Sequence, residues 1–264
     1  MTAPNISNPT HPAAAMNQVR LPRTAALGPG LGGQPRLLID APAGAAEIYL
    51  HGATLTSWVP RGGSEVIFTS RQAVFDGSTA IRGGIPLCLP EFGVGINGDA
   101  VPKHGWARIA PWQLRMVAST DDGGVRALLS VSRDHLTALY EVEIGETLRL
   151  GLSLRNDGNA PRTVEAAAHT YLSVHDVTAS LISGLAGASY SDNLAHSPQE
   201  AHRVQDGDVK ISGPVDRIYD SAEPVAVTDP GHERTIHVDK LNAPSTIVWN
   251  PWSTYSAPLP DMAD

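Results

Sequence analysis

Alternation of apolar and polar residues is the strongest pattern in the chain. Within residues 147–155 leucine takes every second position, and Tyr140, Val142 and Ile144 continue the alternation upstream. Successive side chains of a β-strand point to opposite faces, so a period of two predicts half-buried strands and not helix.

Further short apolar segments follow the same rule and are separated by turn residues. Glycine, aspartate and asparagine cluster at 121–124 and 156–159, where they favour tight turns. No segment shows helical periodicity over three turns. Many short strands joined by such turns predict an all-β sandwich or barrel. The other predicted strands are residues 36–41, 46–50, 53–59, 65–69, 112–117, 125–132, 162–168, 179–182, 234–238 and 246–249.

Length and composition indicate a globular protein. The chain has 264 residues, of which 42% are hydrophobic and 17% charged, and β-sandwiches of this size are often single domains. Residues 1–34 mix proline, asparagine, alanine and glycine without an apolar stretch, so we interpret them as a flexible leader. Residues 35–264 are then expected to form one domain.

Charge and cysteine content exclude several classes of function. A net charge of −8 argues against general nucleic-acid binding, which needs a basic face. The single cysteine, Cys88, excludes an internal disulfide and favours a reducing compartment; its leucine neighbours predict a buried, apolar role. No segment approaches the roughly 20 apolar residues of a membrane helix. We expect a cytoplasmic protein, with a monomer favoured, that binds neither nucleic acid nor membrane.

Two cationic segments carry the candidate chemistry. Arg82 precedes two glycines, and Lys103, His104 and Arg108 lie within six residues of one another. Arginine presents a planar fork of donors that matches phosphate or carboxylate, and histidine changes charge near neutrality. The segments predict a site that binds an anionic small molecule and moves a proton on it. Ordinary surface arginines paired with carboxylates, and histidines with a structural role, are the alternatives.

Five motifs in order resemble the aldose 1-epimerase superfamily, and within it the glucose-6-phosphate 1-epimerase (hexose-phosphate mutarotase) branch. They are RGGIPLCLPEFG at 82–93, HGWAR at 104–108, AHTYL at 168–172, VDRIY at 215–219 and VWNPW at 248–252. The resemblance implies a galactose-mutarotase-like antiparallel β-supersandwich. It also implies a reaction without cofactor or metal, in which the α and β anomers of a hexose 6-phosphate interconvert by acid/base ring opening.

The resemblance also implies roles for individual residues. His169 matches the family's general acid, whose alternative is a core histidine bonded to a backbone carbonyl. His104 matches a histidine that binds or orients the sugar. Arg82 and Arg108 match substrate-binding arginines that could hold the 6-phosphate, and Lys103 stands where glutamine is usual. Asp216 matches a carboxylate that binds sugar hydroxyls; a surface pair with Arg217 is its alternative.

The general base of the family is a glutamate well after the VWNPW motif. Residues 253–264 contain no glutamate, so we expect the base beyond residue 264, in a chain that is truncated at its C-terminus. As it stands, the chain should then epimerise poorly. A non-catalytic sugar-phosphate binding module is the alternative. A third reading makes His104 and His169 metal ligands of a cupin-like barrel, and it is weaker because the clustered ligand spacing of a metal site is missing.

Overall fold

Two compact units make up the part of the protein that the computed structural model describes, residues 19–262. The first unit contains residues 19–69 and 73–172, and the second contains residues 70–72 and 173–262. Each is built from antiparallel strands, which confirms the all-β prediction.

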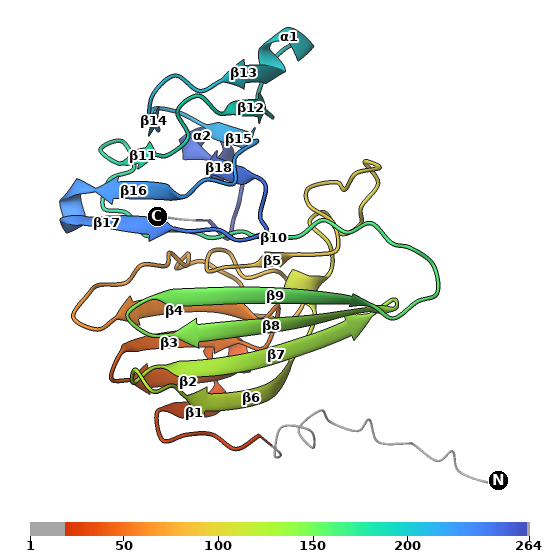
Figure 1. Cartoon of the computed structure of the whole chain (residues 1–264), viewed down its shortest axis with the longest axis vertical. Coiled ribbons are helices and arrows are strands. Elements are labelled where there is room, and N and C mark those ends of the chain that lie inside the picture. The colour runs from red at the N-terminus through yellow and green to blue at the C-terminus, as the bar shows by residue number, and fades with distance from the viewer. Residues whose placement is uncertain (1–18, 263–264) are drawn as a thin grey trace. The chain divides into compact units, whose positions relative to one another are not determined.

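Two four-stranded sheets form the body of the first unit (Figure 1). One has the order β1-β2-β3-β4 and the other β6-β7-β8-β9, so every neighbour in a sheet is also its neighbour in sequence. The strands are β1 (Ala25–Pro29), β2 (Pro35–Ala41), β3 (Gly44–Tyr49), β4 (Thr54–Pro60), β5 (Leu87–Cys88), β6 (Gln113–Ser119), β7 (Val125–Arg133), β8 (Leu136–Ile144), β9 (Leu148–Asn156) and β10 (Ala167–Ala168).

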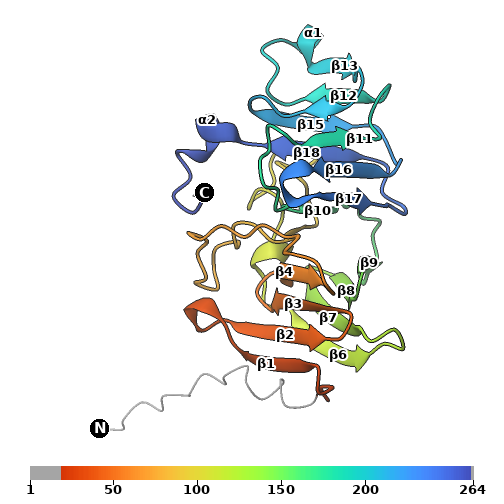
Figure 2. The same cartoon turned by 90° about the vertical axis from the view of Figure 1, so that its left-hand side faces the viewer.

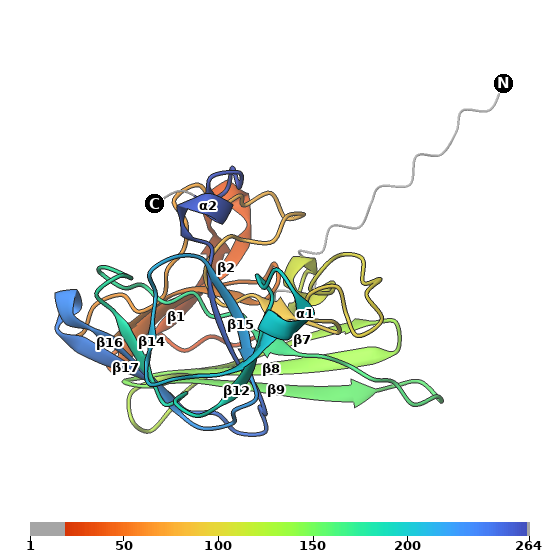
Figure 3. The same ribbon diagram turned by 90° about the horizontal axis from the view of Figure 1, so that it is seen from above.

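The two sheets enclose a single core, as expected when each has one apolar face. In β8 every second residue from Leu136 to Ile144 is buried, and the residues between them are more exposed. The leucines of β9 are half-buried while the residues that alternate with them are exposed. Both strands therefore confirm the predicted period of two, and Figure 3 shows them side by side with β7.

A short pair of strands, β5 and β10, adds to this sandwich, with Cys88 opposite Ala167. The prediction of longer strands here was wrong: only the last two residues of 162–168 are strand, and 65–69 makes isolated bridges through Ile67 and Thr69. The residues that lie opposite these two segments explain why longer strands do not form. Prolines at 86 and 90 cannot donate to a ladder, and the glycines at 83 and 84 have positive φ.

The second unit is a smaller sandwich of two sheets, β14-β11-β16-β17 and β13-β12-β15-β18 (Figure 2). Its own core includes Tyr190, Val215, Tyr219 and Val248. The strands are β11 (Leu181–Ser183), β12 (Ser189–Asp192), β13 (His202–Val204), β14 (Val209–Lys210), β15 (Val215–Tyr219), β16 (Val225–Asp229), β17 (Arg234–Val238) and β18 (Thr246–Asn250).

Two short α-helices interrupt the strands of the second unit, α1 (Pro198–Ala201) and α2 (Trp252–Ser256). Neither they nor any other helix within residues 19–262 combines the length and the apolar character needed to cross a membrane.

Strand β1 lies inside the region predicted to be a leader. Ala25–Pro29 pairs in register with the start of β2, so the ordered chain begins before residue 35. Its glycine and two flanking prolines hide the strand from a search for alternation. Residues 1–18 of the predicted leader lie outside the described residues, and the assignment of 35–264 to one domain stays a prediction.

In the first unit, alanine substitution of a buried leucine should destabilise the fold far more than substitution of an exposed leucine. Leu129 of β7 is fully buried and lies opposite Tyr140, whereas Leu139 of β8 is 40% exposed. We expect Leu129→Ala to lower the free energy of unfolding by about 2–5 kcal/mol, because it removes buried methyl groups and leaves a cavity. Leu139→Ala should cost under about 1 kcal/mol. Urea denaturation followed by circular dichroism measures both, and equal losses would contradict the assignment of the core.

Candidate active site

Backbone hydrogen bonds fix the position of Arg82 in the first unit. In the segment that follows Arg82, Ile85 N–H donates to the Leu55 carbonyl of β4 (2.9 Å). Gly84 N–H donates to the Phe68 carbonyl (2.7 Å). Gly84 has φ +70°, and a Cβ there would stand 2.6 Å from the Leu55 carbonyl oxygen. The glycine pair after Arg82 is therefore required for this close approach.

His104 is held in a tight loop by hydrogen bonds to the carbonyl and to the N–H of Gly93. Its N–H donates to the Gly93 carbonyl (2.7 Å), and its ring Nδ1 accepts the Gly93 N–H (3.1 Å). The next residue, Gly105, has φ +71°, and a Cβ there would overlap the Leu89 carbonyl. Because Nδ1 is an acceptor, a neutral His104 carries its proton on Nε2, where it can donate to a ligand.

His169 follows β10, and its N–H donates to the Pro86 carbonyl (3.0 Å). Its half-buried ring lies 6.2 Å from the ring of His104, with the planes nearly perpendicular. On another side it stacks on Tyr171, with centroids 4.8 Å apart and planes inclined by 21°. Two imidazoles predicted from motifs 65 residues apart thus meet at one place.

Both predicted arginines belong to the same group. Arg82 Nη1 lies 3.5 Å from the Tyr171 hydroxyl, and Arg108 Nη2 donates to the Lys103 carbonyl (2.8 Å). Arg108 Nε is buried and has no hydrogen-bond partner within residues 19–262, nor does Arg108 form an ion pair there. Lys103 itself is exposed.

Burial and nearby cations keep both imidazoles neutral. The pKa of His104 is lowered to about 4, mainly by burial and then by Arg108, His169, Lys103 and Arg82. The pKa of His169 is also lowered to about 4, mainly by burial, with Arg108 and Arg82 adding to the effect. Like charges disfavour protonation at short range.

Cys88 of β5 is fully buried, as its sequence context predicted. Burial raises the pKa of its thiol to about 11. The thiol is therefore protonated near neutral pH and packs as a small apolar group.

Asp216 is the one predicted site residue outside the first unit. It lies on β15 of the second unit, where its carboxylate accepts a hydrogen bond from the Asn193 side chain (2.9 Å). The alternative pairing with Arg217 does not occur, because Arg217 forms an ion pair with Asp192 (3.4 Å) and lies over the Tyr190 ring. Its contact with substrate stays a prediction.

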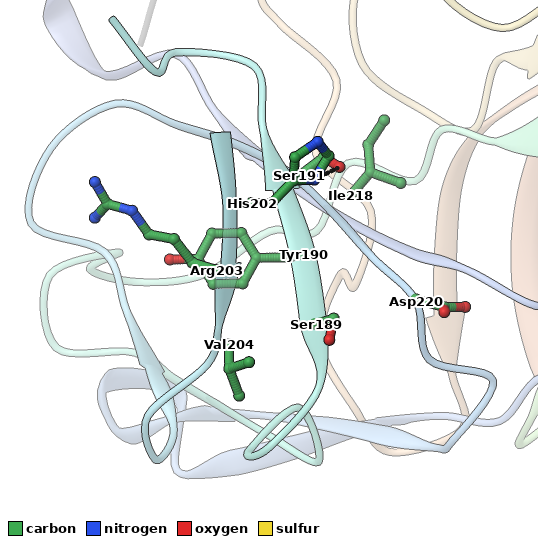
Figure 4. A pocket seen from close by; sticks show the side chains of 8 residues that line it. All are labelled: Ser189, Tyr190, Ser191, His202, Arg203, Val204, Ile218 and Asp220. Atoms are coloured by element: carbon green, nitrogen blue, oxygen red, sulfur yellow. Dashed lines mark hydrogen bonds between the residues drawn. The ribbon is translucent and has the colours of Figure 1, made fainter. Parts of the chain in front are cut away.

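A cavity of about 420 Å³ lies on the second unit, across β12, β13 and β15 (Figure 4). It contains none of the predicted site residues, and its lining is made by Ser189, Tyr190, Ser191, His202, Arg203, Val204, Ile218 and Asp220.

Among the described residues, no three His, Cys, Asp or Glu side chains are grouped as metal ligands, which leaves the metal hypothesis without support.

Comparison with known proteins identifies the family. The family model for aldose 1-epimerase matches residues 35–264. The chain belongs to the aldose 1-epimerase family. It is therefore an isomerase of the class that interconverts the anomers of a sugar, and small sugars are its class of substrate.

Curated relatives are about 30% identical to this chain over the aligned residues. It is 32% identical over 237 residues to a Cenchrus ciliaris protein named "Putative glucose-6-phosphate 1-epimerase", covering 83% of this chain and 70% of that one. A Salmonella typhimurium protein of the same name is 29% identical over 238 residues, covering 86% and 78%. The resemblance seen in the motifs is thereby confirmed.

Solved structures confirm the galactose-mutarotase-like fold. A Salmonella typhimurium protein described as a "putative mutarotase" matches with a TM-score of 0.83 and 28% identity, covering 92% of this chain and 83% of that one. A "galactose mutarotase-like protein" from Clostridium acetobutylicum matches with a TM-score of 0.70 and 11% identity, covering 86% and 84%. The second match shows the fold alone.

Lowered histidine pKa values should make the protein less stable in mild acid. A pKa of about 4 for His104 and His169 in the folded chain lies below the ordinary 6.5, so the unfolded chain binds more protons between these values. Stability is then constant above pH 6.5 and falls as the pH drops toward 4. We expect each histidine to contribute a loss of about 1–2 kcal/mol between pH 7 and pH 5.

Urea denaturation at the two pH values measures this loss. The variant His169→Asn removes one of the two titrating rings, so its loss should be smaller than that of the unaltered protein. An equal loss in the variant would contradict a lowered pKa at His169.

Proposed function

We propose that this aldose 1-epimerase family member interconverts the α and β anomers of a hexose 6-phosphate, with glucose 6-phosphate as the expected substrate. The observation that carries the proposal is the convergence of Arg82 and Arg108 on two neutral imidazoles, those of His104 and His169. The names of the curated relatives, at about 30% identity, support the same substrate.

A phosphate fits this group of charges better than a neutral sugar does. Guanidinium forks bind phosphate oxygens through short, charge-assisted hydrogen bonds. The charged groups that act on both histidines are cations, with Arg108 the strongest for each and Arg82 also contributing to each. An anion placed among them would gain from both arginines, and the exposed ammonium of Lys103 would add to the attraction.

The reaction needs one acid and one base. A base takes the proton of the anomeric hydroxyl, an acid protonates the ring oxygen, and the C1–O5 bond opens. Rotation about C1–C2 and ring closure then give the other anomer. We assign the acid to His169, and the Nε2–H of His104 to orientation of the sugar. The base remains the glutamate that the family resemblance implies, and Asp216 is assigned to the sugar hydroxyls.

The neutral state of His169 gives the phosphate a second role in this proposal. A general acid works best with a pKa near the working pH, whereas burial and two arginines hold the pKa of His169 near 4. A bound phosphate offsets the positive charge of Arg82 and Arg108. The substrate itself would thus raise the pKa of His169 toward the range that proton donation requires.

Binding titrations at fixed ionic strength test the ligand class. We expect the unaltered protein to bind glucose 6-phosphate at least about tenfold more tightly than glucose, because charge-assisted bonds to Arg82 and Arg108 add to the sugar contacts. Arg108→Ala should remove most of that preference. Arg61→Ala, which removes an exposed partner of Glu146, is the matched control and should retain it. A preference that survives in Arg108→Ala would contradict the proposed phosphate site.

Exchange between the anomers of glucose 6-phosphate, measured by NMR, tests the chemistry. We expect His169→Asn, made in a version of the protein that contains the glutamate base, to lower kcat about 100-fold or more while the Kd changes little, because the loss of a positioned acid affects mainly the transition state. An unchanged kcat would reject His169 as the acid. Tight binding with no acceleration by that glutamate-containing version would reject the enzymatic reaction and favour the binding module.

A further inference from the structure

Tyr171 contacts both His169 and Arg82, although the family resemblance gives it no role. It stands two residues after His169, just beyond the end of β10. Their rings stack at 4.8 Å with an angle of 21°. One face of the His169 imidazole is therefore covered by the tyrosine ring, which limits how that imidazole can turn.

The hydroxyl of Tyr171 reaches the arginine that is assigned to phosphate. Arg82 Nη1 lies 3.5 Å from Tyr171 Oη, at the long end of hydrogen-bond distance. Burial raises the pKa of Tyr171, and Arg82 and Arg108 only partly offset this effect. The hydroxyl stays neutral near pH 7, so it can accept from the guanidinium without forming an ion pair that would compete with a phosphate.

The backbone of Tyr171 is fixed on both sides. Its N–H donates to the Gly84 carbonyl (2.9 Å), and its carbonyl accepts from Phe68 N–H (2.9 Å). The ring of Phe68 lies 6.5 Å from the tyrosine ring at 29°. A side chain that starts from so rigid a point can hold two neighbours in a constant relation.

We propose that Tyr171 is a positioning residue that holds the His169 imidazole through its ring and the Arg82 guanidinium through its hydroxyl. The proposal rests on the proposed function, because it assumes that His169 donates the proton and that Arg82 binds the phosphate. The two functions reside in different atoms of one side chain, so two substitutions can separate them.

Tyr171→Phe removes the hydroxyl and keeps the stacked ring. We expect the Kd for inorganic phosphate and for glucose 6-phosphate to rise about 3–10-fold, as for loss of one hydrogen bond to a charged group. The NMR titration of His169 in the ligand-free protein should match that of the unaltered protein. An unchanged Kd for both probes would overturn the role of the hydroxyl.

Tyr171→Leu removes the hydroxyl and the stacked ring together. Relative to Tyr171→Phe, we expect the same Kd and a pKa of His169 raised toward 6.5 because its burial is reduced. We expect kcat to fall about tenfold despite the higher pKa, because the imidazole is no longer held in one orientation. A merely structural tyrosine would change stability without this difference between the variants. Equal His169 titration and equal kcat in the two variants would overturn the role of the ring.

Tyr219→Phe supplies the matched control. It removes a tyrosine hydroxyl of the second unit that donates to Gln205 (2.8 Å), so it should leave the Kd and the His169 titration unchanged; a change in either would show that these readouts do not report on Tyr171 specifically and would overturn the assignment. Failure of the unaltered protein to bind either phosphate probe would reject the proposed function instead. In that case the His169 titration still decides whether the tyrosine ring holds the imidazole.

Discussion

The short pairing of β5 with β10 is the contact on which the site depends. Arg82 and His169 are far apart in sequence, and only two paired residues with a few flanking bonds bring their chain segments together. Proline and glycine on the β5 side keep this ladder short, so the chain leaves it before a regular sheet can form. Side chains that would otherwise belong to a flat sheet face instead converge near one point.

Electrostatic strain is the cost of that convergence. Two guanidiniums lie near two imidazoles, and burial weakens the solvent screening that would otherwise reduce their repulsion. The protein limits the repulsion by leaving both imidazoles neutral, as their lowered pKa values show. Perturbed pKa values of this kind concentrate at functional sites. The unsatisfied Nε of Arg108 belongs to the same compromise between stability and readiness to bind.

Sequence alone predicts the regular part of this fold well. Strands β8 and β9 follow from a period of two because each packs one face on the core. Strands such as β12, β13 and β14 carry only two to four residues, too few to show a period, and their formation depends on partners elsewhere in the chain. Strand β1 is obscured by proline and glycine but is formed by pairing with β2.

The candidate site, too, is only partly predictable from the sequence. Arg82, His104, Arg108 and His169 stand in motifs, and their residue types already indicate an anion and a proton. Their mutual distances, the acceptor role of His104 Nδ1 and the neutral state of both rings come from tertiary contacts that no motif encodes. Tyr171 stands in the same motif as His169, but the motif predicts neither the stacking of the two rings nor the contact with Arg82.

The charge of the substrate completes the argument for a phosphorylated sugar. In an empty site, burial and then the positive field of Arg108 and Arg82 oppose protonation of His169, the very state that a general acid needs. A neutral aldose would leave that field in place, so its ring oxygen would face an imidazole without the extra proton. A phosphorylated aldose cancels part of the field when it binds. In the proposed function, discrimination between the two sugars would belong to the chemical step as well as to binding, because the anion that is recognised would also prepare the acid.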